Sequence, residues 1–343
     1  MVTNEGSVHL VGSVPLASVP EVLKCCADRL GPTISRLTDG EAGGWVNIPS
    51  SSLIKANGIE DDPDHKSIYE QVSYPRYRLS KGVDPAAIRF APTTYVDIAR
   101  SSYAIFKQAQ AAGDIPSNVR FQQCMPTPHA ALSMAMTVED TLKLLPHFSQ
   151  HVFNEVRQIC DEIPHEDLAF QWDVAVEVVE VLANYRPDMA ERISREDVAT
   201  NLARALDAVP ADVPCGMHLC YGCVDNKPVV QFPDLSEMVK LANRVVAKAH
   251  RPLSWLHVPG PHGPYDEDRF FAPLVDLKLS PETEFYLGVV NLDEAGTLQR
   301  TLVAKRVMRS FGVGSECGLR YFKPEEVGEL LTIHRKAAAA AAA

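Results

Sequence analysis

The sequence has no apolar run long enough to cross a membrane, and its amino terminus lacks the charged and then apolar pattern of a signal peptide. It also lacks a basic stripe, because 33 Lys and Arg residues stand against 44 Asp and Glu residues, which gives a formal net charge of −11. That absence disfavours nucleic acid as a partner. We therefore expect a cytoplasmic protein that acts on a small molecule, with no nucleic-acid partner and no membrane association. The oligomeric state is left open.

Two further absences disfavour one class of fold and one kind of cysteine chemistry. No G-x-G-x-x-G motif follows the first predicted strand, which disfavours an open dinucleotide-binding sheet. Because no signal peptide precedes them, the eight cysteines indicate free thiols rather than disulfides. The rest of the composition, 46% hydrophobic and 22% charged over 343 residues, is that of an ordinary globular protein.

Short apolar segments alternate with segments of helical periodicity along most of the chain. The predicted strands are residues 8–12, 34–37, 119–124, 168–173, 213–221, 253–258, 284–290 and 312–316. The predicted helices are residues 20–30, 95–112, 138–163, 176–184, 195–208, 236–250, 297–311 and 324–334. This alternation predicts an α/β fold with a parallel sheet buried on both faces, and eight units favour a closed (β/α)₈ barrel of the TIM type.

Two stretches depart from this alternation within a predicted single domain of residues 1–336. Residues 45–92, after the second strand, are rich in Pro, Asp, Ser and Tyr and lack sustained periodicity. Because long irregular stretches are usually functional or disordered, we interpret this insertion as a lid over one end of the barrel. The closing alanine run, residues 337–343, is interpreted as a disordered tail outside the fold.

The chemistry centres on His218 and Cys220, two residues apart in an apolar run that stops at Gly222. In a strand, side chains at i and i+2 lie on one face, so the imidazole and the thiol would point the same way. Cys317 follows another predicted strand. The three residues would supply zinc ligands, although His and Cys on buried strands can also be plain packing. Cys223 forms a C-x-x-C pair with Cys220 and is interpreted as an incidental loop cysteine.

The active site of such a barrel lies at the carboxyl ends of its strands. Glu41, Asp173 and His257 are the expected catalytic groups there. The expected substrate contacts are Gly12, Ser13, Asp39, Glu41, Trp172, Asp173, Tyr221 and Asn291. Carboxylates at a mouth that excludes water can have raised pKa values and serve as acid or base. Trp172 and Tyr221 would form walls of the pocket, although barrel aromatics are more often core packing.

These motifs resemble the catalytic, C-terminal half of cobalamin-independent methionine synthase, in the barrel superfamily that also holds uroporphyrinogen decarboxylase. The resemblance runs at low similarity from Val8 to about His334. It rests on Val11-Gly12-Ser13, Gly40-Glu41, Gln171-Trp172-Asp173, His218-Leu219-Cys220-Tyr221 and Glu316-Cys317-Gly318-Leu319. It implies a (β/α)₈ barrel, one zinc ion held by His218, Cys220 and Cys317, and a substrate amine held by Glu41 and Asp173.

The chain also departs from that family's pattern. The family's fourth zinc ligand is usually a Glu at the end of the next strand, where this chain has His257. The resemblance then implies His257 as fourth ligand, in a site of two thiolates and two imidazoles that is formally neutral with zinc. Where the family has a catalytic His after the following strand, this chain has Asn291.

The resemblance therefore implies zinc-dependent alkyl or methyl transfer to a thiol substrate, rather than folate-dependent methionine synthesis itself. Two alternatives stay open. One is a lyase, isomerase or decarboxylase that uses Asp39, Glu41 or Asp173 as acid and base, with or without zinc. The other is a non-catalytic protein that binds zinc or a thiol metabolite.

Overall fold

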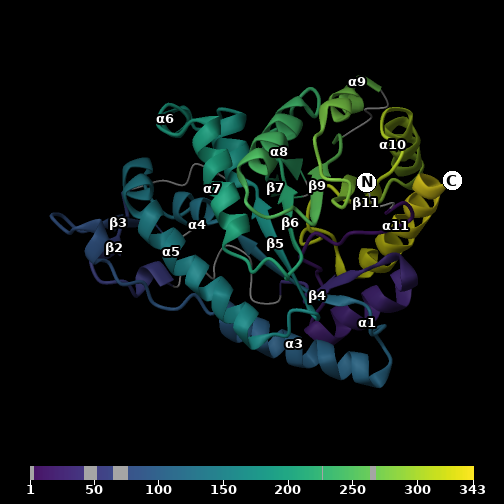
Figure 1. The fold of residues 1–343 in the computed structure, drawn as a ribbon, viewed down its shortest axis with the longest axis horizontal. Coiled ribbons are helices and arrows are strands. Elements are labelled where there is room, and N and C mark those ends of the chain that lie inside the picture. Colours follow the sequence, from purple (N-terminus) through teal and green to yellow (C-terminus); the bar gives the residue numbers. More distant parts are fainter. Residues whose placement is uncertain (1–3, 42–51, 65–75, 226, 263–267) are drawn as a thin grey trace.

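The core of the molecule is a parallel β-sheet. In a computed structural model, which describes residues 4–41, 52–64, 76–225, 227–262 and 268–343, seven strands form this sheet in the order β1-β4-β5-β6-β9-β10-β11 (Figure 1). They are β1 (Arg36–Thr38), β4 (Arg120–Pro126), β5 (Leu168–Val174), β6 (Cys215–Leu219), β9 (Trp255–Pro259), β10 (Glu284–Val290) and β11 (Gly312–Ser315). Every neighbouring pair is parallel, so the carboxyl ends of the strands lie along one edge.

Helices surround this sheet (Figure 1). The longer ones are α1 (Val19–Leu30), α3 (Tyr95–Ala112), α5 (Val138–Glu162), α7 (Arg195–Asp207), α8 (Ser236–Lys248), α10 (Glu294–Val307) and α11 (Val327–Ala342). The short ones are α4 (Pro128–Ser133), α6 (Pro187–Ala190), α9 (Asp268–Phe271), the π-helix η3 (Val178–Leu182) and the 3₁₀ helices η1 (Gly31–Thr33), η2 (Pro85–Ala87), η4 (Ala272–Asp276) and η5 (Pro324–Glu326). In the described part of the chain, no helix combines the length and the apolar character that a membrane span needs.

Local sequence explains where several of these helices begin and end. The hydroxyl of Thr137 accepts a hydrogen bond from the backbone N–H of Asp140 and so caps α5. Ser194 and Asp197 form a reciprocal capping box at the start of α7. Gly113 ends α3 in the left-handed conformation, with φ 82°, which glycine adopts without steric cost.

The predicted strands and helices are largely confirmed, but the start of the chain differs from the prediction. Residues 8–12 form a single parallel bridge, between Val8 and Val313, rather than a ladder. The backbone N–H of His9 donates to Val313 O at 2.8 Å, while that of Val8 donates to Thr33 O at 2.8 Å. Farther along, Val14 N–H donates to Gly40 O at 3.2 Å. This segment therefore bonds both to β11 and to the residues that flank β1.

The prediction that residues 337–343 form a disordered tail is wrong. Helix α11 continues to Ala342, and Ala337, Ala338 and Ala341 are buried. Alanine has the highest helix propensity, and its small side chain lets the helix approach its neighbours closely. The helix packs against α1, β11 and α10, so the two ends of the chain lie near each other (Figure 1).

The predicted insertion, residues 45–92, is described only in part, because residues 42–51 and 65–75 lie outside the described residues. Its described portion contains an antiparallel pair, β2 (Ile59–Asp61) and β3 (Tyr77–Leu79), which lies away from β9 and β11 (Figure 1). The backbone N–H of Tyr77 donates to Ala135 O at 2.9 Å, and Arg76 donates to Met134 O. The interpretation as a lid stays a prediction.

A buried ionic cluster holds the π-helix η3 in place after β5. Glu180 is fully buried, and its carboxylate accepts hydrogen bonds from Ser133 Oγ at 2.7 Å and from Arg186 Nη1 at 3.2 Å. His129 Nε2 lies 3.2 Å from the same carboxylate. A buried charge is stable only when it is paired and hydrogen-bonded, and here several groups share that role.

We predict that Arg186→Met lowers the free energy of unfolding by about 3–5 kcal/mol, because the Glu180 carboxylate would lose the cation that compensates its burial. Urea unfolding followed by circular dichroism measures this. Arg306→Ala is the matched control, because the Arg306–Asp268 pair is exposed on both sides and should contribute less than about 1 kcal/mol. Equal losses in the two variants would contradict the role given to the cluster.

Candidate metal centre and substrate cavity

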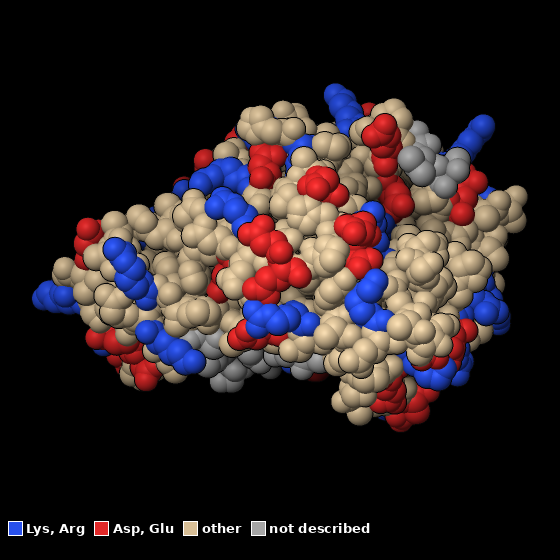
Figure 2. Space-filling view, turned by 60° about the horizontal axis from the view of Figure 1, so that its bottom comes forward, with Lys and Arg blue, Asp and Glu red and all other residues tan. Residues whose placement is uncertain are grey.

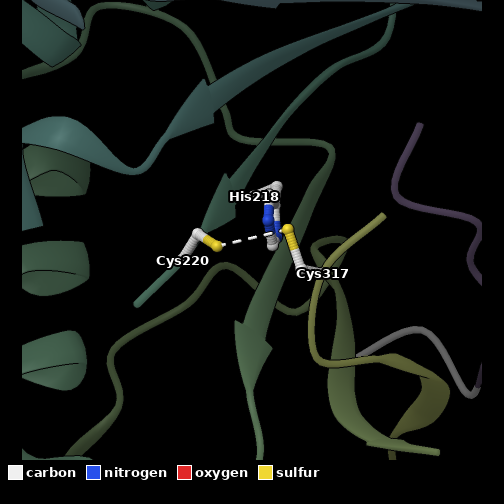
Figure 3. Close-up of side chains that lie close together, drawn as sticks. All are labelled: His218, Cys220 and Cys317. Atoms are coloured by element: carbon white, nitrogen blue, oxygen red, sulfur yellow. Dashed lines mark hydrogen bonds between the residues drawn. The ribbon is translucent and has the colours of Figure 1, made fainter. Parts of the chain in front are cut away.

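Three side chains that the sequence predicted as zinc ligands lie together at the carboxyl ends of the strands. His218 is in β6, Cys220 follows β6 and Cys317 follows β11 (Figure 3). One potential ligand atom from each lies within 4.8 Å of the other two, and the two sulfur atoms are 3.4 Å apart. Among the described residues, this is a group that could hold a metal ion.

A hydrogen bond between two histidines determines which nitrogen of His218 is available. His218 and His257 face each other in the register of β6 and β9, and their Nδ1 atoms are 2.7 Å apart. Both residues are buried, at 2% and 0% exposure. One Nδ1 must donate and the other accept, so neither is free to bind a metal while this bond exists.

His218 Nε2 is the nitrogen that remains. It is buried and has no hydrogen-bond partner among the described residues, which is unusual for a polar atom in a protein interior. Burial, followed by the nearby His257, keeps the pKa of His218 well below its ordinary value, so the imidazole is neutral, as a metal ligand must be. A histidine with an unpartnered nitrogen, grouped with two thiols, is a donor set that suits zinc, so these residues fit that ion.

The structure does not place His257 in this group, contrary to the sequence prediction. Its Nδ1 is engaged by His218, and its Nε2 points toward Gly314, where an added Cβ would lie 3.0 Å away. Burial lowers the pKa of His257 to about 3, so it too is neutral near pH 7. His257 therefore contacts a candidate ligand rather than joining the three.

A cavity of about 120 Å³ opens beside the metal group. Its lining includes apolar residues, which come mainly from the segments after β4, β5 and β6, namely Met134, Ala175, Val176, Val179 and Val229. It also includes polar and charged residues, namely Ser13, Glu41, Asp173 and Arg320. The cavity can thus hold a small molecule that has one apolar part and one part with hydrogen-bonding groups.

Glu41 and Asp173 both line the cavity, and their carboxyl groups interact. Burial, then the nearby carboxylates of Asp173 and Asp39, raise the pKa of Glu41 well above its ordinary value, while Arg320 acts in the opposite direction. Asp173 Oδ1 accepts a hydrogen bond from Gln171 Nε2 at 2.8 Å. The carboxyl of Glu41 is therefore suited to holding a proton near neutral pH.

Gly12 and Asp39 act on Glu41 instead of lining the cavity. A Cβ on Gly12 would lie 2.3 Å from Glu41 Oε1, so only glycine leaves room for that carboxyl. Asp39 Oδ1 accepts from the backbone N–H of Glu41 at 2.8 Å, and its Oδ2 accepts from Ser102 Oγ at 2.7 Å. These contacts hold Glu41 in its left-handed conformation, with φ 56°.

Two aromatic residues that were predicted to form walls of the pocket point elsewhere. Trp172 is fully buried, its Nε1 donates to Ala205 O at 2.9 Å, and its ring packs near those of Phe153 and Phe170. Tyr221 is also fully buried and packs near Phe232. Side chains alternate along a strand, so Trp172 lies on the opposite face of β5 from Asp173. Tyr221 follows β6 and is not among the residues that line the cavity, whereas Cys220 is. The prediction that they line the cavity is wrong.

Asn291 also lies outside this cavity. Its Oδ1 accepts from the backbone N–H of Asp293 at 2.9 Å, in the turn that leads into α10. It lines a smaller neighbouring pocket, which shares Cys223, Cys317 and Gly318 with the main cavity. Its predicted contact with a substrate in the main cavity is therefore not supported.

Several cavity residues were not predicted. In the sequence, Met134, Val176 and Val179 cannot be distinguished from ordinary core residues. Arg320 follows the Cys317 motif but belongs to no motif that would indicate a role in the cavity. Cys223 did carry a signal, the C-x-x-C spacing, but was interpreted as incidental. The structure places it in the cavity lining beside Cys317.

The fold has known counterparts, although no family model and no curated protein matches the sequence. The chain is similar to a B12-independent methionine synthase from Shewanella sp. W3-18-1, whose structure is in complex with selenomethionine. The TM-score is 0.59 at 12% identity, over 98% of this chain and 96% of that one. A methyltransferase from Methanosarcina mazei gives a TM-score of 0.54 at 13% identity, over 94% of each chain. The structural resemblance expected from the motifs is confirmed at the level of the fold.

We predict that Glu41→Gln stabilises the protein at neutral pH and flattens its pH dependence. Folding raises the pKa of Glu41 above its ordinary value of 4.5. In the pH range between 4.5 and this raised pKa, the folded state keeps a proton that the unfolded state has released. Stability must then fall as the pH rises through that range, and glutamine removes this loss. Urea unfolding from pH 4.5 to 8 measures it, with Glu191→Gln on the exposed surface as control. An unchanged slope in Glu41→Gln would show that the carboxyl is not perturbed.

Proposed function

We propose that this chain is a zinc-dependent enzyme that transfers a methyl or other alkyl group to the thiol of a small molecule. The observation that carries the proposal is the group of His218, Cys220 and Cys317, which lines the same cavity as Glu41 and Asp173. The fold shared with a methionine synthase and a methyltransferase supports the same reaction class.

The proposal includes a closed (β/α)₈ barrel, in which residues 8–14 serve as the strand between β11 and β1. Support comes from the backbone bonds that Val8, His9 and Val14 make toward both sides of the gap. In such a barrel the carboxyl ends of all strands face one mouth, and active sites lie there.

Zinc in this site would lower the pKa of a substrate thiol and hold it as the thiolate, the form that attacks an alkyl carbon. His218 would bind through Nε2, and Cys220 and Cys317 would bind as thiolates. The bond to His257 would fix the ring of His218 and the position of its proton, as the outer partners of metal-bound histidines usually do.

The carboxyl groups of Glu41 and Asp173 would bind the other end of the substrate. Because one of these two groups retains a proton easily, the pair can donate one hydrogen bond and accept another, which suits an amine or a hydroxyl. The apolar side of the cavity, with Val176 and Val179, would exclude water from the reacting atoms. The alkyl donor is not specified by these residues.

A second function is favoured by the same carboxyl groups. The raised pKa of Glu41 is a property expected of a general acid or base, so a lyase, isomerase or decarboxylase acting on a small acid or alcohol is the alternative. The two functions differ in their need for a thiol. Turnover that depends on an added thiol supports alkyl transfer, whereas turnover without a thiol supports acid–base chemistry.

We predict about one zinc per chain, measured by elemental analysis of protein that has never met a chelator. His218→Ala and Cys317→Ser should lose the zinc and all thiol-dependent alkyl transfer, because each removes a ligand. Cys25→Ser on α1, which is also half-buried, should keep both. If the wild-type protein contains no zinc, even after zinc is added, the proposal of zinc-dependent alkyl transfer is wrong and acid–base chemistry is favoured.

We further predict that His257→Ala keeps the zinc stoichiometry and weakens zinc affinity about 10- to 100-fold, the usual cost of losing an outer hydrogen-bond partner. His257→Gln, whose amide can still bond to His218, should recover part of this loss. Competition against a fluorescent chelator measures both variants. Complete loss of zinc in His257→Ala, with the fold intact by circular dichroism, would instead mean that His257 is a ligand.

A further inference from the structure

A third thiol lies beside the candidate zinc ligands. Cys223 is three residues after Cys220, at the start of the short strand β7 (Cys223–Val224). Its thiol is within hydrogen-bonding contact of Cys317, which also contacts Cys220. Cys223 lines both the main cavity and the neighbouring pocket, next to Cys317. It lies outside the three residues whose ligand atoms are all within 4.8 Å of one another, so its thiol would have to move toward His218 and Cys220 when a metal binds.

The backbone around Cys223 is folded so that this side chain returns to the group. Gly222 has φ 69°, and its carbonyl accepts a hydrogen bond from Val229 N–H at 2.9 Å. Strand β7 then pairs antiparallel with β8 (Lys227–Pro228), with Cys223 opposite Pro228. A Cβ on Gly222 would lie 3.0 Å from Val179 Cγ2, so the turn also packs tightly on the cavity wall. Cys223 is therefore held by a hairpin and not by a loose loop.

The chemistry of the ligand set also favours a third thiol. Zinc in proteins is usually held by four donors, and three Cys with one His is a common combination. Here His218, Cys220 and Cys317 supply three donors, and the two histidine nitrogens that face each other are occupied by their own hydrogen bond. Three thiolates and one neutral imidazole around a divalent cation carry a net charge of −1, whereas two thiolates and two imidazoles would carry none. The additional thiolate would make the bound sulfur atoms richer in electrons.

We propose that Cys223 is the fourth protein ligand of the metal in the substrate-free protein, so that the site is built from Cys220, Cys223, Cys317 and His218. This inference rests on the proposed function, because it assumes that the other three residues bind zinc. It assigns a ligand role to a residue of the C-x-x-C pair, and it gives His257 the role of positioning His218.

Cobalt(II) titration of the metal-free, fully reduced protein tests this proposal. The near-ultraviolet absorption that arises from thiolate-to-cobalt charge transfer increases with the number of bound thiolates. Cys223→Ser should lower its intensity by about one third, as expected on going from three thiolates to two, and should weaken zinc binding by more than about 10-fold. Cys25→Ser is the control for loss of a half-buried thiol and should match the wild type.

The outcomes separate the two proposals. If Cys223→Ser matches the wild type in absorption and affinity, Cys223 is not a ligand, and the three-residue site stands alone. If the wild type binds neither cobalt nor zinc, the proposed function fails and this inference fails with it. X-ray absorption spectroscopy of the wild-type zinc protein decides the matter without any variant. Three sulfur neighbours and one nitrogen support the proposal, and two sulfur neighbours overturn it.

Discussion

The candidate site depends on one constraint, the alternation of side chains along parallel strands whose carboxyl ends are aligned. Asp173 and His218 are partners in the register of β5 and β6, and His218 and His257 are partners in that of β6 and β9. Residues that are register partners on adjacent strands point to the same face of the sheet. A shift of one residue in β5 would exchange Asp173 for Trp172, and a shift in β6 would likewise turn His218 away from the site.

A buried polar network links this site to the interior of the sheet. Gln171 Nε2 donates to Asp173 Oδ1 and to Val11 O, while its Oε1 lies 2.8 Å from His9 Nε2 and accepts from Trp255 Nε1 at 3.2 Å. Both amide protons are used, so His9 must carry its proton on Nε2. A fully satisfied network of this kind specifies a single arrangement of buried side chains, and here it fixes the direction of a cavity carboxylate.

Sequence reasoning succeeded where the signal was local. Apolar runs that ended in Gly or Pro located the strands, and the spacing of His218 and Cys220 predicted that the imidazole and the thiol would be close together, which they are. It failed where contacts between distant parts of the chain determine how a side chain is bonded or buried. The hydrogen bond between His218 and His257 depends on the register of two strands 39 residues apart, and no local pattern encodes it. The burial of Ala341 likewise depends on neighbours that are distant in the sequence. A run of alanines has the same sequence whether its helix packs against the protein or is disordered.

The charged side chains on the surface indicate less about function than those in the interior. On the face shown in Figure 2, acidic and basic side chains are interspersed and the basic ones form no continuous band. The groups that would contact a substrate are instead enclosed, because the carboxyl groups of Glu41 and Asp173 and the thiols of Cys220 and Cys317 all line the cavity. In the proposed function these two kinds of group orient the substrate, since an amine or hydroxyl is attracted to Glu41 and Asp173 while a sulfur atom is directed to the metal group. Holding Glu41 beside Asp173 lowers the stability of the empty protein, and a substrate that neutralises or bridges the two carboxyl groups would restore it. The same pair of carboxyl groups would then contribute to specificity, because a molecule without a hydrogen-bonding group at that end could not offset the cost of burying them.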